Sequence, residues 1–128
     1  MSDISEERIQ AGFEQFSRML GNERAAEMRA AWHRISPEFE KFVLGSLAAE
    51  MWTRPQLDLR TRSLVTVGGL SALGRSKALA LNIEMALTNG ATREEICEAI
   101  LQMGFYAGFP TAWEGIAAAT EVFEQFDG

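Results

Sequence analysis

A carboxylate, an indole and a guanidinium stand close together in the segment Glu50-Met51-Trp52-Thr53-Arg54-Pro55, and Arg62 follows at the start of a mostly apolar stretch. A guanidinium among apolar residues needs an anionic partner, which is either a carboxylate of the protein or one that belongs to a ligand. The segment therefore indicates a binding site for a small acid. A structural salt bridge of Arg54 or Arg62 with Glu50 is an equally good interpretation.

Asn82 and Tyr106 are two further side chains that could take part in chemistry. Residues 78 to 87 are apolar apart from Asn82 and Glu84. A buried amide without a hydrogen-bond partner costs about 1–3 kcal/mol, so Asn82 either bonds within the protein or faces a ligand. Tyr106 is the only tyrosine and precedes the predicted end of a helix at Gly108. Its hydroxyl either reaches a pocket or, in the plainer interpretation, is satisfied in the core.

Other kinds of site find little support in the sequence. One histidine and one cysteine give no Ser-His-Asp elbow, no disulfide and no metal cluster. Glu95 and Glu98 flank Cys97 and raise a thiol pKa, which predicts an inert core cysteine. His33 is expected at the surface or half-buried. The glycines lack the spacing of a phosphate-binding loop.

The composition narrows the class of protein. A formal net charge of −6 argues against nucleic acid as a partner, because such surfaces carry an excess of Lys and Arg. No apolar run approaches the ~20 residues that span a membrane. The acidic, polar start differs from a signal peptide, so a cytoplasmic protein is expected. At 128 residues the chain fits one domain.

Apolar residues recur at helical spacing, and the period of two that marks strands is absent. Capping residues and breakers then divide the chain into seven short helices. They are expected over about Ser5–Leu20, from there to Ile35, from Pro37 to before Pro55, from near Asp58 to Leu73, over Ser76–Thr88, from Thr92 to before Gly108, and after Pro110.

The apolar stripes predict which faces are buried. The helix after Pro37 is expected to bury Phe39, Phe42, Val43, Leu47 and Met51. The next helix is expected to turn Leu64, Val65, Val67, Leu70 and Leu73 to the core, with another helix packed closely on Gly68-Gly69. Residues 76 to 88 are apolar on more than one face, which indicates a subunit interface.

Four segments in fixed order carry a family resemblance: AEMWTRPQL (Ala49–Leu57), RSLVTVGGLSALGR (Arg62–Arg75), NG-x-T-x-x-E-I-x-E (Asn89–Glu98) and YAGFP (Tyr106–Pro110). Together they resemble the carboxymuconolactone decarboxylase family, most strongly over roughly Phe39 to Phe123. The resemblance implies an all-α orthogonal bundle of about six to seven short helices, alkylhydroperoxidase D-like, formed as a single domain over residues 1–128. It also implies a homo-oligomer, either a trimer or a hexamer.

Members of that family decarboxylate a carboxylated muconolactone in the β-ketoadipate pathway of aromatic catabolism, without metal or organic cofactor. The resemblance thus implies a lyase for a small carboxylate or lactone. The Cys-x-x-Cys motif of the related peroxidases is absent.

Asn82 stands where the family carries a histidine. The resemblance leads us to expect Glu50 as acid or base, Asn82 and Tyr106 as hydrogen-bond donors, and Trp52, Arg54 and Arg62 as substrate-binding residues. Two alternatives are a relative recruited to another reaction, such as a cyclase or isomerase of specialised metabolism, and a non-catalytic oligomer that binds a small acid. Glu50, Arg62 and Asn82 lining one cavity would favour an enzyme.

Overall fold

The computed structural model describes residues 3–127, and these residues form helices and connecting turns without a strand. The predicted all-α fold class is confirmed. Contacts divide the chain into two compact units, one up to Gln56 and one from Leu57 onward, so the single domain stays a prediction. The helices are α1 (Glu6–Leu20), α2 (Asn22–Ile35), α3 (Pro37–Phe42), the π-helix η1 (Val43–Met51), α4 (Leu59–Leu73), α5 (Ser76–Thr88), α6 (Arg93–Ala107) and α7 (Phe109–Asp127).

Two helix starts confirm their predicted capping residues, whereas α7 begins at Phe109 and not after Pro110 as expected. Ser36 Oγ accepts a hydrogen bond from the backbone N–H of Phe39 at 3.1 Å. Thr92 Oγ1 accepts from the backbone N–H of Glu95 at 3.0 Å, and Glu95 Oε1 accepts from the N–H of Thr92 at 2.9 Å. The capping box predicted for α6 is therefore confirmed.

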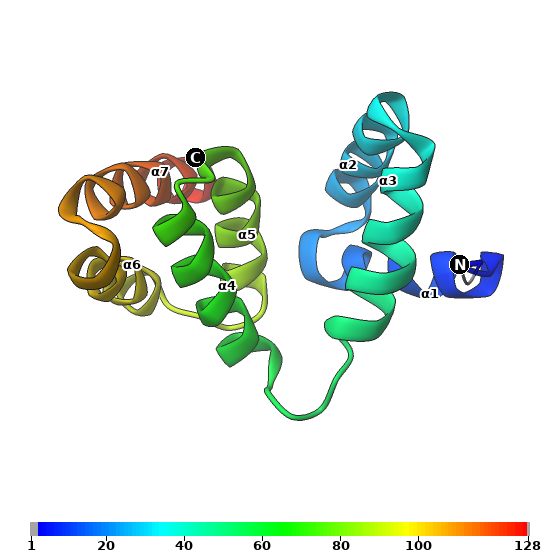
Figure 1. The fold of residues 1–128 in the computed structure, drawn as a ribbon, viewed down its shortest axis with the longest axis horizontal. Helices are drawn as coiled ribbons and strands as arrows, with labels where there is room; N and C mark the ends of the chain where they lie inside the picture. The colour runs from blue at the N-terminus through cyan, green and yellow to red at the C-terminus, as the bar shows by residue number, and fades with distance from the viewer. Residues whose placement is uncertain (1–2, 128) are drawn as a thin grey trace. The chain divides into compact units, whose positions relative to one another are not determined.

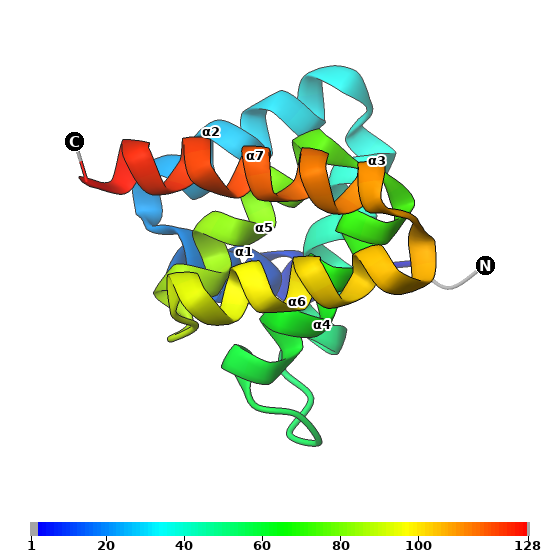
Figure 2. The same cartoon turned by 90° about the vertical axis from the view of Figure 1, so that its left-hand side faces the viewer.

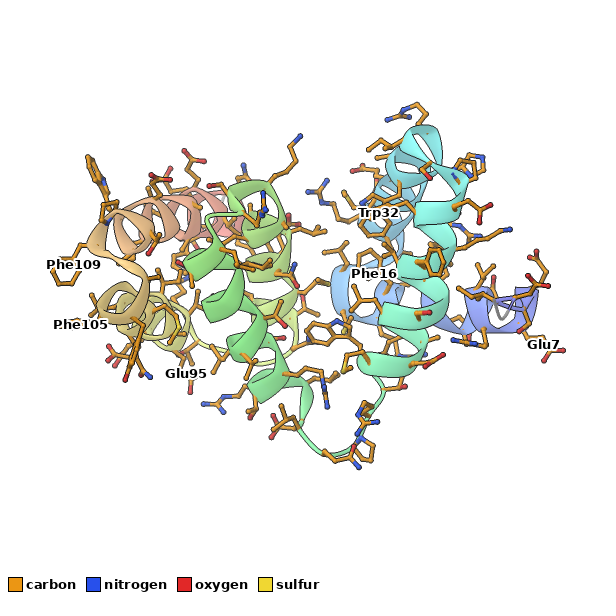
Figure 3. The ribbon with its side chains drawn as sticks, viewed as in Figure 1. Glu7, Phe16, Trp32, Glu95, Phe105 and Phe109 are labelled. Carbon is orange, nitrogen blue, oxygen red and sulfur yellow. The ribbon has the colours of Figure 1, made fainter. Side chains whose placement is uncertain are left out.

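In the first unit, α1 crosses the helix that α3 and η1 form together, and α2 packs on both α1 and α3 (Figure 1). The rings of Phe16 and Trp32 meet with centroids 5.1 Å apart (Figure 3). The buried apolar residues of this unit are Ile9, Phe16, Met19, Ala25, Leu44, Ala48 and Trp52.

The contact between α1 and η1 is a contact of backbones. A Cβ atom on Gly12 would lie 1.6 Å from the carbonyl oxygen of Leu44, well inside the van der Waals distance. Glycine is therefore required at position 12 for α1 to approach η1 this closely.

The π-helix departs from the sequence prediction of one regular α-helix after Pro37. Its last turn is closed by the N–H of Trp52, which donates to the carbonyl of Leu47 at 3.1 Å, five residues back. The helix ends before Pro55, as predicted.

The predicted buried face of this helix is wrong. Phe39, Phe42, Leu47 and Met51 are 47–49% exposed, and only Val43 of the predicted set is half-buried. The buried positions follow one another in steps of four instead: Glu40, Leu44 and Ala48. The wider π-turn and the contact with α1 turn this second face inward.

In the second unit, α4 packs against α5 and α6, and α7 packs against α5 and α6. Figure 2 shows α6 and α7 side by side and antiparallel, joined at Gly108. The core consists of Val67, Leu79, Ile83, Ala86, Ala91, Ile96, Ile100, Ala112, Ala119 and Val122.

The prediction that α4 buries Val65 and Leu73 is wrong, because these residues are 62% and 70% exposed. The close packing predicted at Gly68-Gly69 holds for one glycine. A Cβ on Gly68 would meet Met103 of α6 at 3.3 Å, whereas one on Gly69 would meet nothing within 4 Å.

No helix within residues 3–127 is long and apolar enough to cross a membrane.

The α1–η1 contact predicts opposite effects of two glycine-to-alanine substitutions. Gly12→Ala forces the backbones apart and should destabilise the protein by about 1–3 kcal/mol. Gly69→Ala, at an open position inside α4, should stabilise it by up to about 1 kcal/mol. Urea denaturation followed by circular dichroism measures both. Equal stability of the two variants would contradict the tight contact.

Candidate functional site

Glu50 lies near the end of η1, and its side chain is 61% exposed. Its carboxylate pairs with the guanidinium of Arg8 on α1. The sequence offered Arg54 or Arg62 as the structural partner of Glu50, and the observed ion pair with Arg8 corrects that expectation. Arg8 could not be identified from the sequence, because only the packing of α1 on η1 brings it close to Glu50.

Trp52 and Arg54 lie in the turns that follow η1. Trp52 is 6% exposed. Arg54 is exposed, and its backbone N–H donates to the carbonyl of Met51 at 3.3 Å. Thr53 Oγ1 donates to the carbonyl of Ala49 at 2.6 Å and so caps the end of the π-helix. Thr53 and Arg54 thus both bond to the backbone at the end of the π-helix.

Arg62 lies in the first turns of α4 and is 8% exposed. One of its Nη atoms donates to the carbonyl of Leu57 at 3.4 Å. The neighbouring Ser63, 1% exposed, accepts a hydrogen bond from Nδ2 of Asn89 at 2.9 Å. The expected role of Arg62 toward an acid stays a prediction.

Asn82 lies in the middle of α5 and is half-buried. Its Nδ2 donates to the carbonyl of Ala78 at 2.9 Å, one turn earlier in the same helix. This bond is the structural role that the sequence left open for the amide. An asparagine amide has a second N–H and an oxygen that this bond does not use.

Tyr106 is 82% exposed in the last turn of α6, so the plainer interpretation of a core aromatic is wrong. It belongs to an exposed set that we call the aromatic corner, which lies where α6 passes into α7. The ring centroids of Phe105 and Phe109 are 5.3 Å apart there (Figure 3). The aromatic corner consists of Phe105, Tyr106, Phe109 and Trp113.

The six residues predicted from the sequence fall into two groups. Glu50, Trp52 and Arg54 belong to the first unit, and Arg62, Asn82 and Tyr106 belong to the second. Arg62 and Asn82 lie on α4 and α5, which pack against each other. A hollow at the end of α4 and the starts of α5 and α7 is lined by Arg75 and Glu114 and by none of the six. The single cavity expected from the sequence stays a prediction.

His33 occupies the environment predicted for it, whereas Cys97 does not lie in the core. Cys97 is half-buried, and burial raises the pKa of its thiol, which disfavours the reactive thiolate. The side chain of His33 is 63% exposed, and its Nδ1 lies 2.6 Å from a carboxylate oxygen of Glu40. The residues that the structure describes contain no group of three or more His, Cys, Asp or Glu side chains suited to a metal ion.

Comparison with known sequences assigns the family. The family model described as "Carboxymuconolactone decarboxylase family" matches residues 37–121. The chain belongs to this family. All six predicted site residues lie within the matched range, whereas Arg8 lies before it.

Three similar proteins extend this result. The 4-carboxymuconolactone decarboxylase of Acinetobacter baylyi is 34% identical over 119 residues, which cover 93% of this chain and 89% of that protein. An uncharacterized 15.0 kDa protein of Paracoccus denitrificans is 30% identical over 103 residues, covering 79% and 76%. A nitrosuccinic acid decarboxylase of Metarhizium robertsii is 38% identical over 66 residues, covering 52% and 46%. Two of the three are thus named as decarboxylases.

Glu40 is a buried carboxylate that the sequence pattern missed, because its neighbours predicted an apolar face. Arg29 Nε donates to one of its oxygens at 2.6 Å, and His33 contacts the other. Burial alone would raise the pKa of the Glu40 carboxyl, but hydrogen bonds and charge from Arg29 and His33 outweigh burial and lower it. The cluster ties α2 to α3.

Glu40 should therefore stabilise the fold in a pH-dependent way. A carboxyl whose folded-state pKa is lowered stabilises the fold above its unfolded-state pKa, and loses that effect as the pH falls through the folded value. Glu40→Gln should cost about 1–3 kcal/mol near neutral pH. The difference from the wild type should shrink once the pH falls below the ordinary carboxyl value of 4.5.

Thermal denaturation of both proteins across this pH range measures the effect. Glu38→Gln is the control, because Glu38 forms only an exposed pair with Lys41 at 3.7 Å on the same helix. A constant difference between Glu40→Gln and the wild type at all pH values would contradict the assignment.

Proposed function

We propose that this protein is a cofactor-independent decarboxylase that acts on a small carboxylated lactone or a related enolisable carbonyl compound. The observation that carries this proposal is the 34% identity with 4-carboxymuconolactone decarboxylase along 93% of the chain. The buried Arg62 at the start of α4 gives further support, because a guanidinium there suits a substrate carboxylate.

The proposed chemistry has two demands. Loss of CO₂ breaks a carbon–carbon bond and leaves its electron pair on carbon, from which the charge spreads into the neighbouring carbonyl as an enolate. Hydrogen-bond donors must stabilise that oxygen, and an acid must then protonate the carbon. Arg54 and Arg62 would hold the substrate carboxylate, and Trp52 would contact its apolar part.

Asn82 takes the donor role in this proposal. Its amide can donate to an enolate or lactone oxygen, but it cannot exchange a proton near neutral pH as an imidazole can. The proton must then come from another group. Glu50 is the proposed acid, with the hydroxyl of Tyr106 as a further donor.

Asn82 also supports a second candidate function. The absence of the histidine that the family resemblance leads us to expect suits recruitment to another reaction, such as a cyclase or isomerase reaction in which a different group moves the proton. The relative named for nitrosuccinic acid indicates that proteins similar to this chain act on more than one acid. A non-catalytic oligomer that binds a small acid is the remaining alternative.

Release of CO₂ from 4-carboxymuconolactone, by the wild type and by Asn82→His, tests the proposal. We expect turnover by the wild type, with protonation from a group other than residue 82. Asn82→Ala is the matched control and should lower kcat by about 10- to 1,000-fold if the amide stabilises the enolate.

The other outcomes separate the candidates. Turnover by Asn82→His alone would identify a decarboxylase scaffold in which residue 82 redirects the chemistry, and would favour the cyclase or isomerase. No turnover by either protein would contradict decarboxylation of this lactone. Binding of the lactone without turnover, measured by calorimetry, would favour the binding oligomer.

We also propose that copies of the chain associate through the aromatic corner. Its four side chains are 63–82% exposed, and exposed apolar patches of this kind mark interaction surfaces. Half-exposed apolar residues of α3 and η1 offer a second such face. A homo-oligomer of three or six copies is the assembly that the family resemblance implies.

Light scattering should therefore give the mass of three or six copies of the 14.2 kDa chain. A charge in the aromatic corner, as in Trp113→Glu, should lower the mass, because an unpaired carboxylate would be buried at the interface. Val65→Glu places the same charge on another exposed apolar residue and is the control. A monomeric wild type would contradict association, and dissociation by Val65→Glu alone would place the interface elsewhere.

A further inference from the structure

We propose that Arg8 is a positioning residue that holds the carboxylate of Glu50 against the π-helix. This inference rests on the proposed function, in which Glu50 supplies the proton. Arg8 belongs to α1, which lies before the residues that match the family model, whereas Glu50 lies among those residues.

The guanidinium of Arg8 contacts two acceptors on η1. One Nη atom donates to the carbonyl oxygen of Gly45 at 2.8 Å and also pairs with the carboxylate of Glu50. Gly45 and Glu50 are five residues apart, which is the span of one π-helical hydrogen bond. The carbonyl and the carboxylate therefore lie on the same side of η1, where a single cation reaches both.

The fit between α1 and η1 brings the guanidinium to this place. A Cβ atom on Gly45 would lie 2.1 Å from Cγ2 of Ile4, so a side chain at position 45 would displace the Ile4 side chain just before α1. Ser5 caps α1 by accepting from the backbone N–H of Arg8 at 3.2 Å. The backbone of Arg8 is thus fixed at the first turn of a helix that rests on η1.

The pair is better suited to orient Glu50 than to stabilise the fold. The side chains of Arg8 and Glu50 are 37% and 61% exposed, and ion pairs at such sites contribute little to stability. An exposed glutamate without a partner samples several rotamers. A group that transfers a proton must instead stay within reach of one substrate atom. Removal of Arg8 should then affect turnover far more than unfolding.

The test compares Arg8→Gln with Arg18→Gln. Arg18 lies on the same helix, and its Nη atom contacts Gln15 of that helix, so it controls for loss of a charge from α1. The first measurement is ¹³C relaxation of the Glu50 side chain in the full-length protein, with the signal assigned by Glu50→Gln. Glu50 should become more mobile in Arg8→Gln and stay unchanged in Arg18→Gln. Unchanged mobility in Arg8→Gln would overturn the proposal, whether or not the protein turns over any substrate.

The second measurement is steady-state turnover of 4-carboxymuconolactone. Arg8→Gln should lower kcat by roughly 10- to 100-fold with little change in KM, and Arg8→Lys should restore part of it. In a Glu50→Gln background, Arg8→Gln should add no further loss, because the two residues act as a unit. An active wild type whose kcat is unaffected by Arg8→Gln would overturn the proposal. An inactive wild type would refute the proposed function, and the relaxation measurement alone would then decide whether Arg8 holds Glu50.

Discussion

The contact of the α1 backbone with the η1 backbone is the constraint on which residues 3–56 depend. At Gly12 no side chain separates α1 from the carbonyl of Leu44. The distance between the two helices is therefore fixed by direct contact of their backbones. That distance brings Arg8 over Gly45 and Glu50 and turns Leu44 and Ala48 into the core. An element that carries none of the family motifs thereby determines which face of the motif-bearing helix is exposed.

The positions of the helices could be predicted from the sequence because their ends are set by local chemistry. Ser36 and Thr92 cap the turns that follow them, and Pro55 excludes helix before it, whatever the rest of the chain does. The π-helix could not be predicted in this way, since a hydrogen bond five residues back uses the same residue types as one four residues back. The faces were predicted poorly for a related reason: Phe39 and Met51 are apolar enough for a core, yet the packing of α1 leaves them half-exposed.

The candidate site was likewise predicted only in part: its residue types were found in the sequence, but their contacts were not. The motifs identified residue types, and the family match confirms the class of protein to which they belong. What each side chain contacts depends on tertiary structure. Glu50 pairs with Arg8 from a different helix, and Glu40 pairs with Arg29 and His33 of α2. Spacing in the sequence does not mark these partners, because each pair forms where two helices pack together. Asn82 differs, since its bond to Ala78 joins residues four apart in one helix.

The π-helix also sets the angular phase of the residues that follow it. An α-helix turns by about 100° per residue. A π-helical segment needs more residues for the same rotation, because each of its hydrogen bonds spans five residues instead of four. Glu40 before this segment and Trp52 after it are both buried. Glu50, within the segment, is more exposed and pairs with Arg8. If the same residues wound as a plain α-helix, Glu50, Trp52 and Arg54 would rotate together by up to about 100° relative to Glu40. The hydrogen-bonding pattern of this segment is therefore as much a part of the candidate site as the residues that compose it.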